Sequence, residues 1–284
     1  NVFIDGVGQK NYVLRGGISG QDSSRGNPFP QLAIGEYKVI TSNYKAEYDQ
    51  LSSAAITAVT RSGTNEFEGQ FFWDYTSDKW RSASPSELRN GRKVDSKEEQ
   101  YGVAFGGPIL RDRLFFFMTY ERKEFASPRD VGAQNFDPRL LPAELQTGLG
   151  TTSAPFEEDL YFGKLTWQPG DNHLFELSTK YRDEAELTNI SGINTPSYGT
   201  SKDNESTRVA LRYQYTNGNW LNDANLTFED ESFGPRPITF GPGFNLVDGQ
   251  RRGILNVGGG QDFQDKGQEG WGFQNDLTFF GWEG

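Results

Sequence analysis

The chain has 284 residues, a mean hydropathy of −0.70 and a formal net charge of −11, because 39 acidic side chains outnumber 28 basic ones. This length allows one large β domain or two ordinary domains, and the acidic balance argues against a nucleic-acid-binding protein, which needs a basic surface. The absence of cysteine excludes disulfides and thiolate metal sites.

Aromatic residues make up 14% of this polar chain, and there are 34 glycines. Many aromatic side chains in a polar sequence indicate strands with one apolar face. No run of eighteen apolar residues occurs, so we predict no transmembrane helix, although strands remain able to cross a membrane. The opening NVFIDGVGQK is not a signal peptide, and we therefore expect a mature or partial product.

The first 65 residues predict a small mixed α/β unit, in which short apolar runs end in turn sequences. The run Ser62, Gly63, Thr64 and Asn65 has the composition of a turn or a crossing between two units. We therefore expect one domain over 1–65 and a second over 66–284. The strand-like segments of the first unit are residues 2–4, 12–14, 36–40 and 54–60, with a polar loop at 18–31.

Beyond residue 65, apolar and polar side chains alternate along the chain. Successive side chains of a strand point to opposite faces, so this pattern predicts strands with one apolar and one polar face. Their lengths are close to the 9–11 residues that a tilted strand needs to cross a bilayer. The eight predicted strands are residues 66–76, 98–109, 113–124, 159–168, 172–183, 204–216, 219–230 and 270–281.

The connections between these strands alternate strictly between long and short. Long polar loops are expected at 77–97, 125–158, 184–203 and 231–269, and tight turns separate the other pairs. In an antiparallel meander all long loops then lie at one end, which is typical of outer-membrane β-barrels. Tyrosine and tryptophan near the strand ends fit two interfacial girdles, whereas aromatic pairs in a soluble sheet are the alternative.

The apolar face is the one that a barrel turns towards lipid. The predicted membrane-facing residues are Phe71, Trp73, Phe116, Met118, Tyr120, Leu211 and Tyr213. Eight strands close a barrel that side chains fill, leaving no room for a unit of about sixty residues. If the first unit is a plug, the barrel needs roughly 22 strands, of which this chain supplies about the first third.

Several runs resemble a known family. The segments NVFIDGV, LRGG and IGEYKVITSNYKAEYDQLSSAAITAVTRSGTNEFEG look like the later plug of TonB-dependent outer-membrane receptors, and QYGVAFGGPILRDRLFFFMTYER looks like early barrel strands of the Oar-like branch. The resemblance is strong over residues 1–125. The residues that match the plug motif are Asp5, Gly6, Arg15, Gly16, Gly17, Ser62, Gly63, Thr64 and Asn65.

This resemblance implies an all-β transmembrane antiparallel barrel with an N-terminal mixed α/β plug segment, in the bacterial outer membrane. It implies a receptor that binds an external ligand and imports it with energy from the inner-membrane TonB complex. The ligand class stays open between a peptide, a glycan and a metal chelate. Other implied partners are outer-membrane lipid, lipopolysaccharide and a surface lipoprotein. From the acidic charge we expect no nucleic-acid partner, and we expect no cofactor or metal.

The polar loop of the first unit supplies the candidate ligand contacts, and its alternative role is a structural loop packed on the barrel wall. Plug charges are expected to pair with the inner wall, because unpaired burial is costly. The ligand candidates are Gln21, Asp22, Arg25, Asn27, Phe29 and the more distant Trp80. The candidate wall-pairing residues are Arg15, Lys38, Lys45, Glu47 and Asp49.

No catalytic constellation stands out. His173 is the only histidine and falls on an apolar face, which favours a packing role over a Ser-His-Asp triad. The acidic runs 157–159 and 229–231 fit solvated loop charge better than calcium sites. Two alternatives to a receptor remain: a secreted or surface β-rich module that binds glycan or protein, and a small outer-membrane barrel enzyme.

Overall fold

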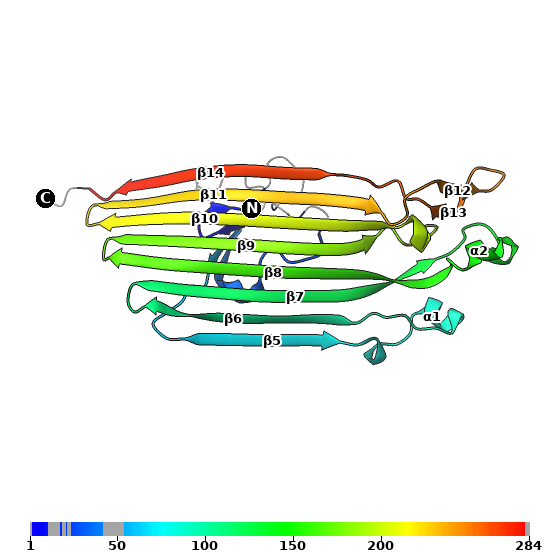
Figure 1. Ribbon diagram of the computed structural model, residues 1–284, viewed down its shortest axis with the longest axis horizontal. Coiled ribbons are helices and arrows are strands. Elements are labelled where there is room, and N and C mark those ends of the chain that lie inside the picture. Colours follow the sequence, from blue (N-terminus) through cyan, green and yellow to red (C-terminus); the bar gives the residue numbers. More distant parts are fainter. Residues whose placement is uncertain (1, 11–17, 19–20, 22–23, 42–53, 282–284) are drawn as a thin grey trace.

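The computed structural model describes residues 2–10, 18, 21, 24–41 and 54–281. These residues form a small N-terminal unit and one broad antiparallel sheet of eight strands, with the unit lying against the middle of the sheet (Figure 1). The strand order is β14-β11-β10-β9-β8-β7-β6-β5, so each strand pairs with its neighbour in the meander. Strands β5 and β14 occupy the two edges, and the sheet is therefore open within the described residues.

The N-terminal unit is a four-stranded sheet in the order β2-β1-β4-β3. Strand β1 runs parallel to β4, and β3 runs antiparallel to it. A 3-10 helix, η1 (Gln31–Ala33), precedes β3, and the predicted strand at 12–14 lies outside the described residues. The strands are β1 (Val2–Ile4), β2 (Val7–Gly8), β3 (Ile34–Ile40) and β4 (Ala55–Thr60).

All eight predicted barrel strands are present. Seven of them are longer than predicted, and most of the extra length lies on the side of the long loops. The strands are β5 (Glu68–Thr76), β6 (Glu98–Leu110), β7 (Leu114–Val131), β8 (Gly150–Gly170), β9 (His173–Thr188), β10 (Thr200–Asn217), β11 (Trp220–Pro237) and β14 (Lys266–Phe279).

The long connections gather at one end of the sheet and the tight turns at the other, as predicted (Figure 1). Strand extensions occupy much of residues 125–158, 184–203 and 231–269, which we predicted to be loops. The loop prediction was therefore wrong for much of these three segments. The polar composition of these extensions hid the strand pattern. The loop end also holds η3 (Asp78–Trp80), α1 (Pro85–Asn90), η4 (Pro138–Leu140), α2 (Ala143–Gln146), η5 (Pro196–Tyr198), β12 (Gly243–Val247) and β13 (Gly253–Gly258).

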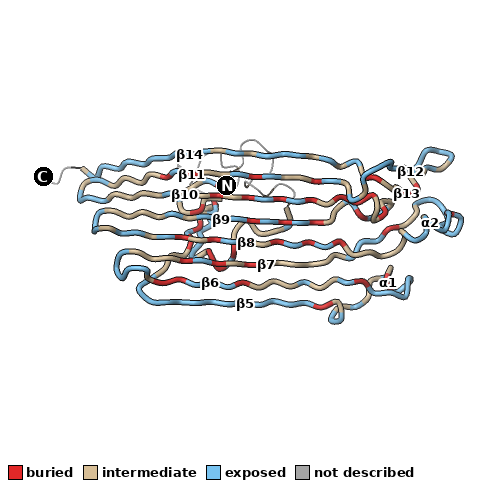
Figure 2. The backbone as a smooth tube through the Cα atoms, viewed as in Figure 1, coloured by how far each residue is buried: buried red, intermediate tan, exposed pale blue. Residues whose placement is uncertain are grey.

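Two buried clusters hold these parts together. One joins the N-terminal unit to the sheet, and the other packs the long connections against each other through Val131, Leu141, Ile190, Ile254 and Leu255. Buried positions recur along the middle of the strands, beside the N-terminal unit (Figure 2). Among the described residues, no helix has both the length and the apolar character to span a bilayer.

Candidate functional site

The boundary between the N-terminal unit and the sheet begins where β1 turns back. Asp5 and Gly6 both have positive φ, of 50° and 83°, which a tight turn requires. The Asp5 carboxylate accepts hydrogen bonds from the backbone N–H of Thr60 (2.8 Å) and from its hydroxyl (2.6 Å). Asp5 therefore fixes the end of β4 before the chain crosses to the barrel.

The crossing itself fits tightly against the sheet. A Cβ atom on Gly63 would lie 2.2 Å from the carbonyl oxygen of Phe116, so only glycine allows this approach. Asn65 exchanges two hydrogen bonds with Asp112 in the β6–β7 turn, donating at 2.6 Å and accepting at 2.8 Å. The predicted motif thus positions β5 beside a turn whose Asp112 has a φ of 63°.

Lys164 is the central cation of the boundary. This β8 residue is only 4% exposed, and its Nζ lies 2.8 Å from Glu176 of β9. The same atom donates to the Thr60 hydroxyl at 3.1 Å and lies 3.6 Å from Asp5. One buried ammonium therefore connects two strands of the sheet with two residues of the N-terminal unit.

Arg208 makes a second connection of this kind on β10. Its guanidinium pairs with Glu229 of β11 at 2.5 Å. It also donates to the Gln9 side chain (2.5 Å) and to the carbonyl of Gly8 (3.3 Å) in the N-terminal unit. Because both polar ends of the contact are satisfied, the buried arginine is tolerated.

Four buried glutamates of the sheet hold residues 24–32, and we name them the glutamate group. They accept hydrogen bonds from backbone N–H groups, a hydroxyl and a guanidinium, which satisfies most of their charged oxygens. The contacts are Leu32 N–H to Glu121 (2.7 Å), Asn27 N–H to Glu158 (2.9 Å), the Ser24 hydroxyl to Glu184, and Arg25 to Glu186 (2.9 Å).

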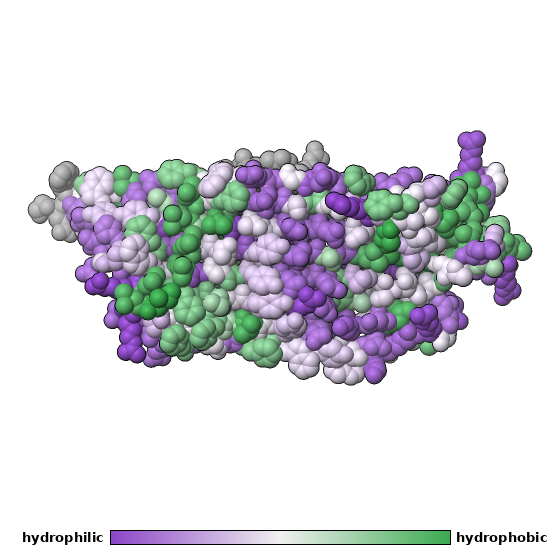
Figure 3. Space-filling view, in the orientation of Figure 1, coloured by the Kyte–Doolittle hydropathy of each residue, from purple (hydrophilic) through white to green (hydrophobic). Residues whose placement is uncertain are grey.

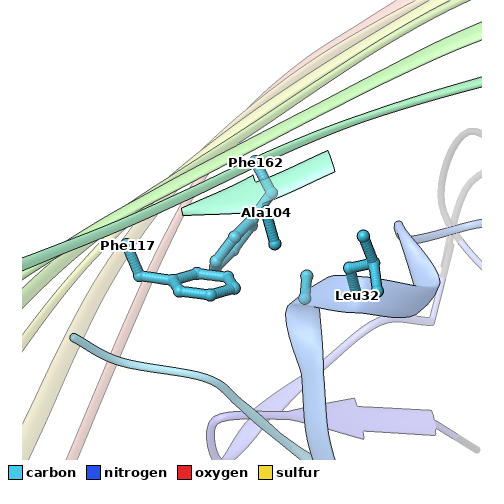
Figure 4. Close-up of a cluster of buried hydrophobic side chains, with 5 residues drawn as sticks. Leu32, Ala104, Phe117 and Phe162 are labelled. Carbon is cyan, nitrogen blue, oxygen red and sulfur yellow. The ribbon is translucent and has the colours of Figure 1, made fainter. Parts of the chain in front are cut away.

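An apolar contact lies beside the glutamate group. Leu32 and Ala33 of η1 pack against Ala104, Phe117 and Phe162, which come from β6, β7 and β8 (Figure 4). The aromatic rings of Phe117 and Phe162 lie 6.4 Å apart and tilted. The N-terminal unit therefore contacts the sheet through a small apolar cluster, and the rest of the boundary is mostly charged and hydrogen-bonded.

The opposite face of the sheet is apolar over the turn-side part of the strands (Figure 3). Six side chains lie in register across six neighbouring strands and form one row, which we name the leucine row. Met118, next to this row, is 53% exposed, which fits a face that turns away from the N-terminal unit. The leucine row consists of Phe116, Leu165, Leu177, Leu211, Leu226 and Phe273.

Aromatic side chains flank the leucine row on both sides. On the loop side, Tyr120, Tyr161 and Tyr181 are in register, with ring centroids 4.9 and 6.0 Å apart. On the turn side, Trp167 and Phe175 have centroids 5.3 Å apart. Tyr161 and Trp167 are six residue steps apart on β8, which is about 20 Å along the strand and about 15 Å along the axis of a barrel whose strands tilt by about 40°. The two aromatic rows therefore both fit within the apolar band of a transmembrane barrel, which is about 25 Å tall.

Comparison with known proteins also indicates an outer-membrane β-barrel. Residues 59–144 match the family model for an outer membrane beta barrel domain. The TonB-dependent transporter Oar of Myxococcus xanthus is 25% identical, over 87% of this chain and 26% of the relative. The chain resembles TonB-dependent outer-membrane receptors. Its location is the bacterial outer membrane.

Solved receptor structures share the fold. The outer membrane transporter YddB from Escherichia coli superposes with a TM-score of 0.70 at 16% identity, covering 98% of this chain and 37% of that one. The ferric enterobactin receptor PfeA from Pseudomonas aeruginosa, as a mutant, gives 0.60 at 14% identity, covering 95% and 37%. The chain thus spans about a quarter of the curated relative's length and 37% of each solved receptor.

The ligand candidates of this receptor-like chain lie mostly on the wall. Arg25 is over the ring of Phe125 at 4.4 Å in addition to its ion pair, and Phe29 packs on Phe162 with centroids 6.0 Å apart. The side-chain amide nitrogen of Gln21 is buried without a hydrogen-bond partner in the described part of the chain. These contacts match the structural alternative for the loop, and ligand contact by these residues stays a prediction.

The other predicted ligand and motif residues either lie away from the loop at 24–32 or lie outside the described residues. Trp80 is 71% exposed at the loop end and packs edge-to-face on Tyr75 at 5.6 Å, so the structure does not bring it to the loop at 24–32. Asp22, Arg15, Gly16 and Gly17 lie outside the described residues, as do Lys45, Glu47 and Asp49.

The predicted wall-pairing residue that is described, Lys38, is exposed on β3. The wall contacts come instead from Asp5, Gln9, Ser24 and Arg25. Sequence alternation places Lys164, Glu121 and Arg208 on polar faces of their strands. The sequence pattern of a polar face is the same whether water or another unit of the protein covers that face. Nothing local in the sequence marks these side chains as buried.

His173 has a packing environment. Its ring nitrogen lies 2.9 Å from the hydroxyl of Tyr213, and its ring is stacked 6.0 Å from that of Tyr213. Across the described ranges, no three histidine or acidic side chains gather in a way that would hold a metal ion. The relatives with printed functions are transporters and receptors rather than enzymes.

Proposed function

We propose that this chain is part of a TonB-dependent transporter, in which residues 1–65 are the later plug and 66–284 the first part of the barrel. The whole barrel has roughly 22 strands, the size whose lumen is plugged. It binds an external ligand at the loop end and imports it with energy from the TonB complex. The observation that supports this most is the burial of Lys164 between the N-terminal unit and the sheet.

The chemistry of this boundary suits a plug that moves. When the two parts separate, charged and hydrogen-bonding groups exchange their protein partners for water. Separating an apolar boundary would instead expose apolar surface to water, which costs more free energy. A wall lined by Lys164, Lys180, Arg208 and the glutamate group also stays wettable once the plug has shifted. Such a wall provides a hydrophilic path for polar cargo.

The two alternatives are less compatible with the structure. A soluble module has no reason to expose the leucine row between two aromatic rows. A small barrel enzyme needs a closed sheet of eight strands, but β5 and β14 do not pair with each other in the described residues. The transported ligand is a peptide, a glycan or a metal chelate, and a surface lipoprotein and lipopolysaccharide are further partners in this proposal.

The test uses the full-length protein with a single introduced cysteine in its own outer membrane. Ala33 is fully buried against the wall, so a cysteine at position 33 reacts with a periplasmic maleimide only when the plug moves. Both strains are grown in spent medium. We expect labelling in the strain that has TonB and much less labelling in the strain that lacks TonB. Equal labelling in both strains contradicts energy coupling.

Two control positions fix the topology in the same experiment. Leu140 is 71% exposed at the loop end, and Asp171 lies in the β8–β9 turn at the other end. A membrane-impermeant maleimide added to intact cells should label a cysteine at 140 and spare one at 171. The reverse pattern would invert the orientation of the barrel.

A further inference from the structure

A cleft of about 740 Å³ lies at the loop end, between α1 and the connection from β7 to β8. Its volume falls within the range of small-ligand pockets, about 300–1,000 Å³. Ser86, Arg89, Asn90 and Arg92 line one side of this cleft, which we name the α1 cleft. It is separate from the boundary that holds the plug.

The α1 side of the cleft is firmly built. Ser84 and Glu87 form a reciprocal capping box, and Arg81 grips the Glu87 carboxylate with two bonds of 2.6 Å. Ser86 then donates to Asp130 at the end of β7 at 2.6 Å. These contacts fix α1 relative to the sheet and so preorganise the cleft.

The charges in the cleft are unbalanced. Both carboxylate oxygens of Asp130 are occupied by hydroxyls, those of Ser86 (2.6 Å) and Thr151 (2.8 Å). Arg89 donates one bond, to Ser86 at 3.0 Å. The guanidinium of Arg92 has no hydrogen-bond or ion-pair partner within the described part of the chain. In a chain with a net charge of −11, two arginines here face a single acid that is already satisfied.

Four other residues of the lining are aliphatic. Val131, Ala133, Pro138 and Leu149 contribute apolar surface next to the two arginines. Val131 and Leu149 also belong to the buried cluster of the long connections, so this surface is fixed from behind. Polar and apolar residues therefore line the cleft in equal measure, so that a ligand can make a charged contact and an apolar contact at once.

We propose that the α1 cleft binds an oxyanion, a carboxylate or a phosphate, carried on a short aliphatic body. A guanidinium matches either anion through paired N–H donors, and the floor accepts the aliphatic part. This binding does not depend on transport. The two sources of such a group are a free carboxylic acid and a free phosphate monoester.

The experiment measures ligand-observed NMR binding to the full-length protein in neutral detergent. The probes are N-acetyl-leucine, its neutral analogue N-acetyl-leucinamide, and isobutyl phosphate. We expect both anions to bind and the neutral amide to bind about tenfold more weakly. A preference for N-acetyl-leucine indicates a carboxylic acid as the ligand, and a preference for isobutyl phosphate indicates a phosphate monoester.

Two variants locate the binding. Arg92→Gln should weaken the binding of both anions about tenfold. The variant should keep its fold, because residue 92 is bound to α1 only through its backbone N–H, which donates to the carbonyl of Glu87. Arg111→Gln, an exposed change in the β6–β7 turn, should leave binding unchanged. Equal binding of the amide, no binding of any probe, or full anion binding by Arg92→Gln overturns the proposal.

Discussion

The Nζ atom of Lys164 lies 3.6 Å from the Asp5 carboxylate, across the boundary between the barrel wall and the N-terminal unit. Lys164→Met removes this contact and the bond to Thr60 while keeping most of the apolar stem. Breaking a buried ion pair by removing one partner costs about 3–5 kcal/mol, and we expect the lower end because Glu176 keeps Arg212 as a partner at 3.2 Å. Limited proteolysis of residues 1–65 in the inserted full-length protein should be faster.

Lys79→Met is the matched control for this prediction, since Lys79 is an exposed lysine of the loop end. It should leave the protease resistance of residues 1–65 unchanged. Unaltered resistance in Lys164→Met would show that the charged boundary does not hold the N-terminal unit on the sheet.

Leu211→Arg tests the membrane face at the centre of the leucine row. An arginine near the middle of the bilayer costs about 2–4 kcal/mol in a transmembrane barrel. Urea unfolding in lipid vesicles should show that loss of stability. Phe240→Arg, at an exposed position of the loop end, should unfold like the parent protein. Similar midpoints for the two variants would refute the assignment of the outer face.

Gly63→Ala tests the tight crossing into β5. The new Cβ would meet two carbonyl oxygens of the sheet, that of Phe116 at 2.2 Å and that of Gly107 at 2.8 Å, and backbone cannot move aside cheaply. We expect overpacking to destabilise the protein by about 1–3 kcal/mol in thermal unfolding. Gly132→Ala has no atom within 4 Å of its new Cβ and should be neutral. Equal effects would mean that the crossing is looser than described.

Glu87→Gln tests the fixed position of α1. The Arg81 guanidinium, followed by the N–H groups of Ser84 and Val94, holds the pKa of the Glu87 carboxyl well below its usual range. Because folding lowers this pKa, the charged pair contributes stability above the unfolded carboxyl pKa, about 4.3, and that stability is lost as pH falls through the folded pKa. The parent loop should therefore resist protease at pH 7 and weaken only in stronger acid.

The variant should be cut faster than the parent at pH 7 in residues 77–97, and the difference should narrow as the pH falls below about 4. An acid-stable protease such as pepsin extends the measurement to low pH. Glu144→Gln, in exposed α2, provides the control. A constant difference at every pH would show that the carboxylate charge is not what matters.

Local pattern was enough to predict the membrane-crossing strands. Alternation in segments such as Leu114 to Lys123 depends on the period of a strand alone. It failed at the loop end, where the Ser127 to Asp130 extension contains a proline and has polar side chains on both faces, a composition typical of a loop. It also could not pair Glu121 with the N–H of Leu32, because the two are 89 residues apart and only the folded arrangement brings them together.

The same limit applies to the ligand candidates. Composition marked Arg25 and Phe29 as groups that would interact with something, and in the structure they interact with the wall. The α1 cleft was largely missed because its floor and its arginines come from two connections that have no sequence signal in common. Arg92 and Asp130 come to line the same cleft only because α1 is fixed on the end of β7.

The length of β8 has a consequence for where the loop end of the sheet lies. Eleven residues of this strand continue from Tyr161 to Gly150, beyond the row of tyrosines that marks the edge of the membrane band. At about 3.3 Å per residue and a barrel tilt near 40°, this part of the wall rises roughly 25–30 Å above the lipid. The sheet therefore extends beyond the apolar band by about the height of the band itself, and its loop end lies far from the lipid surface.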